Sequence, residues 1–164
     1  MTGLPCTGKT TLAGAIAQVL PAAALSADPI DDALVRAGMS LEHRPDIAGY
    51  AVMKALAREQ LALGLSAVID AVNPFVFVRD EYAAMARDAS TPMVVIETVC
   101  SDPVLHRQRV EDRQRRGIKA ITWDGVEHQQ RYYEPHTSDV LRLDSVEPID
   151  RNVALALAHV ARSR

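Results

Sequence analysis

The sequence predicts an α/β fold with a mainly parallel sheet, on two observations. Short apolar runs alternate with longer segments whose apolar side chains recur at helical spacing along the 164-residue chain. This alternation is typical of parallel strands joined by crossover helices. In addition, the glycine-containing segment at residues 3–10 leads directly into the first helical segment, and such a turn commonly joins a strand to a helix in these folds.

The predicted helices begin and end at recognisable residues. Pro21 ends the first, Pro45 and Asp46 open the longest, and Gly64 ends it. Asp102 and Pro103 supply an N-cap and a first helical residue for a later one. The predicted helices cover residues 8–20, 31–38, 45–63, 77–87, 103–116, 126–133 and 151–162.

The predicted strands are short and apolar, and several end at an aspartate. They cover residues 22–27, 66–70, 92–100 and 139–143, of which 93–96 is the clearest buried run. Aromatic residues make up only 4% of the chain, so we expect a core mainly of Ala, Val, Leu and Ile. Without an internal repeat or a linker, residues 1–164 are predicted to form a single domain.

Residues Gly3–Thr10 fit the pattern G-x-x-x-x-G-K-[ST] in full. The two glycines let backbone N–H groups wrap closely around a phosphate, and the following helix adds the positive end of its dipole. Lys9 supplies a positive charge and Thr10 a hydroxyl ligand for Mg²⁺. The pattern predicts binding of ATP with Mg²⁺. The expected nucleotide contacts are Gly3, Leu4, Pro5, Cys6, Thr7, Gly8, Lys9, Thr10 and Thr11.

This loop normally follows a buried strand, yet only Met1 and Thr2 precede it here. We therefore expect the first strand to be truncated at the N-terminus. A start codon assigned too late would explain this, and otherwise the sheet would lack the strand that carries the loop.

Two aspartates at predicted strand ends are candidates for chemistry, because ligands of parallel sheets bind at the carboxyl ends of the strands. Asp28 could deprotonate an acceptor hydroxyl, and Asp70 could hold Mg²⁺-bound water or orient the acceptor. The alternative for each is a structural cap of a helix or turn, and for Asp144 capping is favoured.

Arg109, Arg113 and Arg116 fall on one face of the predicted helix 103–116. They could bind ATP phosphates, with Lys119 following in an irregular segment that continues to Gly125. We interpret residues 107–125 as a lid whose closure excludes water from phosphoryl transfer. The alternative is a solvated basic face, paired with neighbouring acidic side chains.

The net charge and the apolar pattern of the sequence limit the kinds of binding partner to be expected. The net charge of -3 provides no general attraction to nucleic acid or to anionic membranes, and no apolar run is long enough to span a membrane. The two cysteines, Cys6 and Cys100, do not suggest a disulfide framework, and the histidines show no metal-binding spacing. We expect a cytoplasmic protein, monomeric or homodimeric.

With these features the chain resembles the P-loop kinases grouped with zeta toxin and polynucleotide kinase, often described as AAA-family ATPases. Its loop is also similar to that of phosphoseryl-tRNA kinase relatives. The resemblance implies a P-loop NTPase fold, a three-layer α/β/α sandwich. It implies catalytic roles for Lys9, Asp28 and Arg113, nucleotide contacts by Arg109, Arg113 and Arg116, and metal binding by Thr10 and Asp70. Asp70, Asn73 and Arg79 match the family's D-x-x-N…R stretch.

The resulting hypothesis is transfer of the γ-phosphate of ATP to a hydroxyl of a small molecule. One departure bears on the acceptor: many members have an arginine three residues after the first aspartate, where this chain has Asp31. A nucleic-acid acceptor is therefore possible but not favoured. The alternatives are a nucleotide-binding regulatory or toxin-like ATPase without such transfer, or an RNA- or tRNA-end kinase.

Overall fold

The computed structural model describes residues 1–39, 45–117, 121–136 and 139–163. Helices and strands alternate along the chain, as the sequence predicted. The helices are α1 (Lys9–Val19), α2 (Ala27–Arg36), α3 (Pro45–Ala62), α4 (Val76–Asp88), α5 (Pro103–Arg115), α6 (Trp123–Tyr132) and α7 (Ile149–Arg162). The strands are β1 (Ala22–Ser26), β2 (Ser66–Asp70), β3 (Ile96–Val99) and β4 (Leu141–Asp144).

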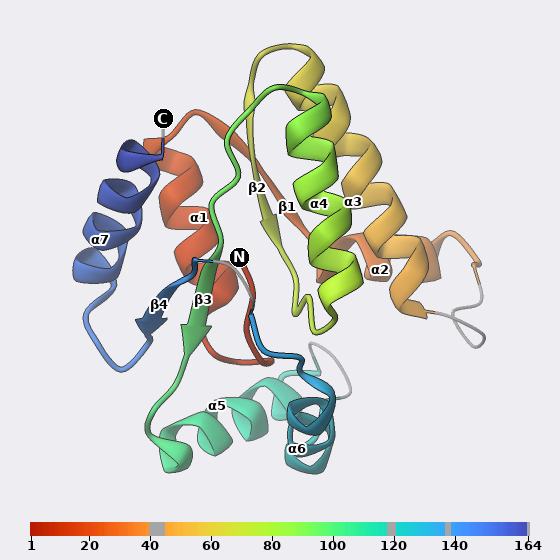
Figure 1. The fold of residues 1–164 in the computed structure, drawn as a ribbon. Coiled ribbons are helices and arrows are strands. Elements are labelled where there is room, and N and C mark those ends of the chain that lie inside the picture. Colours follow the sequence, from red (N-terminus) through yellow and green to blue (C-terminus); the bar gives the residue numbers. More distant parts are fainter. Residues whose placement is uncertain (40–44, 118–120, 137–138, 164) are drawn as a thin grey trace.

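All strand pairs that the structure describes are parallel, as predicted. β1 pairs with β2 in the register Ser26↔Asp70, and β3 pairs with β4 in the register Ile96↔Leu141. The first residues of the chain lie between β2 and β3 and connect the two pairs (Figure 1). The carboxyl ends of all four strands therefore point toward the same edge, where α5 and α6 lie.

In place of a first strand, Thr2 forms a single bridge to Glu97. The Thr2 amide donates to Ile96 O over 2.9 Å, and Thr2 O accepts from the Thr98 amide over 2.9 Å. On the other side, the Met1 ammonium donates to Ile69 O over 2.7 Å, and burial lowers the pKa of this amine to about 6. These contacts hold the start of the loop between the two strand pairs.

Helices cover both faces of the sheet, which forms the predicted three layers (Figure 1). Alternate residues of β2 face opposite sides: Val68 packs toward α1, whereas Ala67 and Ile69 pack toward α3 and α4. The first core cluster comprises Leu12, Ile16, Ile96, Leu143 and Ala156. The second is centred on Ala57, Tyr82 and Met85. The core is thus largely aliphatic, as expected from the composition.

Three predicted boundaries were wrong. The helix predicted at 31–38 begins at Ala27, because Ser26 is its N-cap residue and Asp28 and Pro29 are favourable in a first turn. The strand predicted at 92–100 is shorter, because pairing with β4 begins only at Ile96. The segment predicted to be irregular up to Gly125 instead contains the start of α6, where the Thr122 hydroxyl accepts from the Gly125 amide.

Candidate active site

The loop between Thr2 and α1 has the tight, concave backbone expected of a phosphate-binding loop. Gly3 has a φ of 133°, and a Cβ at this position would lie 2.3 Å from Thr98 O, so a larger residue would collide with β3. Gly8 has a φ of 88° and is the N-cap residue of α1. Cys6 has a φ of 62°, a left-handed conformation that is uncommon for a residue with a side chain. The sequence therefore folds this segment into a tight concave turn.

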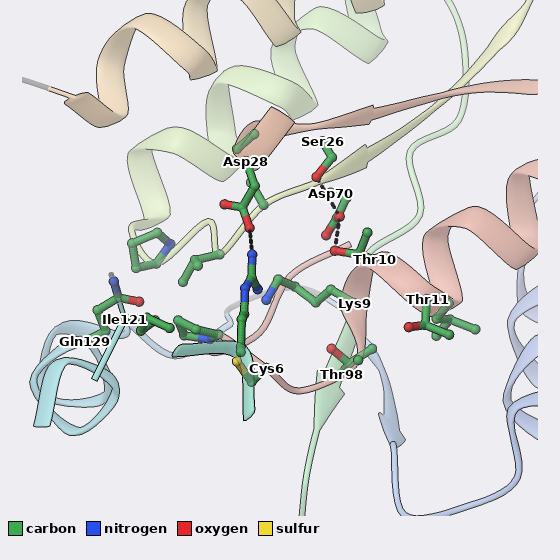
Figure 2. A pocket seen from close by; sticks show the side chains of 18 of the residues that line it. Cys6, Lys9, Thr10, Thr11, Ser26, Asp28, Asp70, Thr98, Ile121 and Gln129 are labelled. Atoms are coloured by element: carbon green, nitrogen blue, oxygen red, sulfur yellow. Dashed lines mark hydrogen bonds and ion pairs between the residues drawn. The ribbon is translucent and has the colours of Figure 1, made fainter. Parts of the chain in front are cut away.

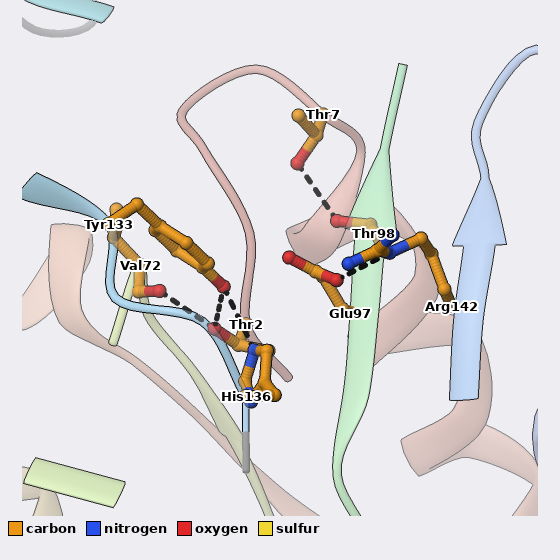
Figure 3. Close-up of polar contacts among 8 residues, drawn as sticks. All are labelled: Thr2, Thr7, Val72, Glu97, Thr98, Tyr133, His136 and Arg142. Carbon is orange, nitrogen blue, oxygen red and sulfur yellow. Dashed lines mark hydrogen bonds and ion pairs between the residues drawn. The ribbon is translucent and has the colours of Figure 1, made fainter. Parts of the chain in front are cut away.

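Threonine side chains fix the cradle to the sheet. The Thr7 hydroxyl lies 2.8 Å from Leu4 O, inside the loop, and 2.9 Å from the hydroxyl of Thr98 on β3. The Thr2 hydroxyl donates to Val72 O over 2.9 Å and contacts the Tyr133 hydroxyl (Figure 3). The loop is thereby held in its concave conformation by contacts to distant parts of the chain.

Lys9 is 8% exposed, and its ammonium donates to Leu4 O over 2.8 Å. Burial lowers the pKa of Lys9 to about 8, although the charges of Asp70 and Asp28 act in the opposite direction. The lysine therefore lies within its own loop, next to the position where the motif places a phosphate.

Thr10, Ser26 and Asp70 meet at the carboxyl ends of β1 and β2 (Figure 2). The Thr10 hydroxyl donates to Asp70 Oδ2 over 2.7 Å, and the Ser26 hydroxyl donates to the same oxygen over 3.0 Å. Hydroxyl and carboxylate oxygens are the donors that Mg²⁺ prefers. The described residues contain no group of three His, Cys, Asp or Glu side chains able to hold a metal ion.

Asp28, in the first turn of α2, forms an ion pair with Arg113 of α5. Burial alone would lower the pKa of Arg113, but the hydrogen bond to Asp28 and its charge raise it overall. The Cys6 side chain of the loop also acts to raise the pKa of this guanidinium. The predicted acceptor base and a predicted phosphate-binding arginine are therefore in contact with each other.

The three predicted arginines of α5 line the same cavity but have different surroundings. Arg109 donates to the Ser145 hydroxyl over 2.6 Å and to Ser145 O over 3.0 Å, which ties α5 to the segment after β4. Arg113 contacts Asp28, and Arg116 is the exposed C-cap residue of α5. That all three line one cavity is what residues on one helix face would do, whereas Lys119 lies outside the described residues.

One cavity of about 1480 Å³ joins these groups. Its lining includes the loop, Asp28, Asp70 and the α5 arginines. Side chains of α3, α4 and α6 also line it, including Tyr50, Phe77 and Tyr132. The volume exceeds that of a typical single-ligand pocket, so the cavity has room for a nucleotide and a second molecule.

Two structural residues in the site were not identified from the sequence. His106 of α5 is buried, and its Nε2 donates to Pro5 O of the loop over 2.7 Å. The Ser26 hydroxyl shares Asp70 with Thr10. The position of Ser26 at a strand end was a usable signal, whereas the contact between Pro5 and His106 spans 101 residues and has no local signal.

Arg79, matched to the family's D-x-x-N…R stretch, is buried and donates hydrogen bonds to backbone carbonyls. Its guanidinium donates to Asn73 O and Pro74 O, and to Glu134 O and Pro135 O, at 2.9–3.3 Å. It thus fastens the segment after α6 to the β2–α4 connection.

Asp144 accepts hydrogen bonds from the Ser101 and Val146 amides at 3.2 and 3.1 Å. Burial would raise its pKa, but these bonds and the charge of Arg109 lower it overall. Asp144 therefore has the capping role that the sequence favoured. Cys6 and Cys100 are both free thiols.

A family model described as an AAA domain matches residues 1–136. No curated protein sequence matches the chain. In the described part, no helix has both the length and the apolar character to cross a membrane.

Solved structures of kinases and of a nucleotide-bound protein share the fold at low sequence identity. A candidate kinase from Chloroflexus aurantiacus matches with a TM-score of 0.81 and 20% identity, covering 99% of this chain and 94% of that one. Kti12 from Chaetomium thermophilum, in complex with ADP-AlF3, matches with a TM-score of 0.75 and 20% identity, covering 96% of this chain and 95% of that one. The Mycobacterium tuberculosis APS kinase, in complex with AMPPNP and APS, matches with a TM-score of 0.73 and 18% identity, covering 98% of this chain and 94% of that one. These likenesses agree with the P-loop kinase fold.

Proposed function

The chain belongs to the AAA domain family, and from that premise we propose that it is an ATP-dependent kinase of a small hydroxylated molecule. The observation that carries the proposal is the single cavity. A phosphate-binding loop, a carboxylate and cationic side chains line one space that is large enough for both substrates. Phosphoryl transfer needs few other parts, because it depends mainly on positioning and on compensation of charge.

Lys9 and the loop amides are assigned to the ATP phosphates. The lysine is already buried beside the loop, and it would exchange its bond to Leu4 O for phosphate oxygens. Arg109, Arg113 and Arg116 approach the same space from α5. Their charges would offset the negative charge that spreads over the transferring group.

Asp28 is assigned as the base that takes the proton of the acceptor hydroxyl. It lies in the first turn of α2, at the carboxyl end of β1, and it lines the cavity. To act as a base it must separate from Arg113. Contact between Arg113 and the ATP phosphates would bring about this separation.

Thr10 and Asp70 are the residues that would hold Mg²⁺, the hydroxyl directly and the carboxylate through bound water. When bound, the ion would neutralise phosphate charge. Oxygen atoms 2.7 Å apart on these two side chains are a suitable pair for that role.

The fold likeness to APS kinase supports a small-molecule acceptor, since that protein was solved with AMPPNP and APS. The likeness to Kti12 in complex with ADP-AlF3 also supports nucleotide binding. The acceptor itself is inferred only as a hydroxylated small molecule.

The test is transfer from labelled ATP to a panel of metabolites and nucleic acids, together with equilibrium ATP binding. Lys9→Ala should abolish transfer. Asp28→Asn should slow it by orders of magnitude while ATP still binds. Leu63→Ala provides a control, because this side chain is 71% exposed and lies outside the cavity lining. ATP binding without transfer to any acceptor would favour the regulatory ATPase, and transfer only to RNA ends would favour the nucleic-acid kinase.

A further inference from the structure

Aromatic side chains are concentrated on the walls of the cavity that α3, α4 and α6 form. The chain has only seven aromatic residues, two Phe, four Tyr and one Trp. Four of them line this cavity: Tyr50, Phe75, Phe77 and Tyr132. Both phenylalanines of the chain are therefore at the site, although the core is built mainly of aliphatic side chains.

These rings are accessible. Phe77 is 64% exposed and Tyr132 is 56% exposed. The rings of Phe75 and Phe77 stack with their centroids 5.6 Å apart and their planes within 14°. Phe75 is half-buried and Phe77 is exposed, so the stacked pair offers a flat apolar surface to a ligand.

The cation on these walls is already paired, which does not favour an anionic acceptor. Among the described lining residues of α3, α4 and α6, Lys54 is the only lysine or arginine. Lys54 of α3 forms an ion pair with Glu81 of α4. A phosphate or carboxylate on the acceptor would have to break this pair to gain a cationic partner here, and desolvating it without one would be costly.

We propose, on the basis of the kinase function above, that the acceptor is an uncharged alcohol that carries a flat ring. The ring lies against Phe75 and Phe77, and Tyr132 contacts it from α6. An acceptor hydroxyl oxygen attacks the γ-phosphorus of ATP, a new P–O bond forms, and the bond to the ADP oxygen breaks. The hydroxyl proton passes to Asp28.

Because Phe75 and Phe77 lie at the start of α4 and Tyr132 lies at the end of α6, the ring contacts two separate walls of the cavity. The aromatic residues are specificity-determining rather than catalytic, since the reacting atoms are next to Asp28. Removing one of them should weaken acceptor binding equally in the ground and transition states, which raises KM and leaves kcat unchanged.

The experiment compares matched acceptors with labelled ATP. Uridine and a phenyl-substituted diol are tested against uridine monophosphate and gluconate, which carry a phosphate or lack a ring. We expect transfer to at least one ring-bearing neutral alcohol and little to the anions. Phe77→Ala should raise the KM for that alcohol about tenfold, as expected for loss of one stacking partner, and change kcat less than twofold. Leu63→Ala should leave both constants unchanged.

A binding measurement separates this inference from the kinase function. The Asp28→Asn variant, loaded with a non-hydrolysable ATP analogue, is titrated with the same four compounds. Binding of a neutral ring compound that Phe77→Ala weakens, without transfer by the unmodified protein, would support the aromatic subsite and contradict the kinase function. Equal or better transfer to gluconate or to the monophosphate, or an unchanged KM in Phe77→Ala, would overturn the subsite and leave the kinase function intact. The aromatic subsite would likewise be overturned if no ring compound bound to the protein or accepted phosphate.

Discussion

Arg113 on α5 forms an ion pair with Asp28 on α2, so that the arginine assigned to ATP neutralises the carboxylate assigned to the acceptor. The contact joins two helices from opposite sides of the cavity. The roles proposed for the two residues in transfer require this pair to open. Under that proposal, the base is blocked until nucleotide competes for the arginine.

We predict from this contact that Asp28→Asn tightens ATP binding while it suppresses transfer. Without the carboxylate charge, Arg113 no longer has to break an ion pair before it contacts the phosphates. Both side chains are partly exposed, at 25% and 35%, and such pairs contribute about 0.2–1 kcal/mol. The expected gain in ATP affinity is therefore about 1.4- to fivefold, measured by calorimetry with a non-hydrolysable analogue.

Arg113→Gln provides the matched control for this prediction. It should weaken ATP binding, and in this background the additional Asp28→Asn change should no longer tighten it. A fall in ATP affinity in the single Asp28→Asn variant would contradict both the competition and the role of Asp28 as a base.

A second prediction concerns the pH dependence of ATP binding. Burial lowers the pKa of Lys9 to about 8 in the nucleotide-free protein, and phosphate charges would raise it again in the complex. Above that pH the free protein loses a proton that the complex keeps. ATP affinity should therefore be nearly constant just above neutrality and fall about tenfold per pH unit beyond about pH 8.

Lys9→Arg tests the assignment, because its guanidinium stays charged throughout this range. Its binding should be weaker at neutral pH but should lose the alkaline decline. Cys6→Ser, which removes the other ionisable side chain of the loop, should retain the decline. A decline of equal slope in Lys9→Arg would assign the effect to another group.

A third prediction concerns Mg²⁺. Asp70 shares hydrogen bonds with Thr10 and Ser26, so its removal affects both the ion and the orientation of the Thr10 hydroxyl. Asp70→Ala should raise the Mg²⁺ concentration needed for half-maximal ATP binding by about ten- to a hundredfold. Ser26→Ala, which removes only one neighbour of the carboxylate, should cause a much smaller shift. Equal Mg²⁺ requirements in Asp70→Ala and the unmodified protein would remove Asp70 from the metal site.

The local parts of this site could be predicted from the sequence because short-range rules define them. The loop is set by two glycines and the helix that follows, and parallel pairing brings Asp70 to the same edge as the loop. The spacing of Arg109 and Arg113 likewise places them on one helix face. In each case the information lies within a few residues.

The remaining parts depend on contacts between distant segments. The bond from His106 to Pro5 and the Asp28–Arg113 pair join residues separated by 101 and 85 positions. The clustering of Phe77 and Tyr132 around the cavity also requires the positions of α4 and α6. No periodicity or motif encodes such distances, since they arise only when the helices pack on the sheet.

A fourth prediction assigns Arg79 to stability. Its guanidinium bonds to four backbone carbonyls, and its removal would leave buried acceptors without partners. Arg79→Ala should lower the free energy of unfolding by about 3 kcal/mol, measured by urea denaturation. Arg79→Lys should be intermediate, because an ammonium cannot span both pairs of carbonyls. Arg107→Ala, whose side chain is 60% exposed, is the control and should change stability by less than about 0.5 kcal/mol.

The last prediction concerns the connection between the loop and α6. His106 donates to Pro5 O of the loop, and its ring meets that of Trp123 edge to face at 5.3 Å. Trp123 is the only tryptophan of the chain, so its fluorescence reports on this contact. Nucleotide binding at the loop should change that fluorescence in the unmodified protein.

His106→Ala should lower ATP affinity about tenfold, as loss of a buried hydrogen bond implies, and should remove the fluorescence response even at saturating nucleotide. His106→Gln keeps an N–H donor and should retain part of both properties. An undiminished response in saturated His106→Ala would show that the loop and α6 communicate by another route.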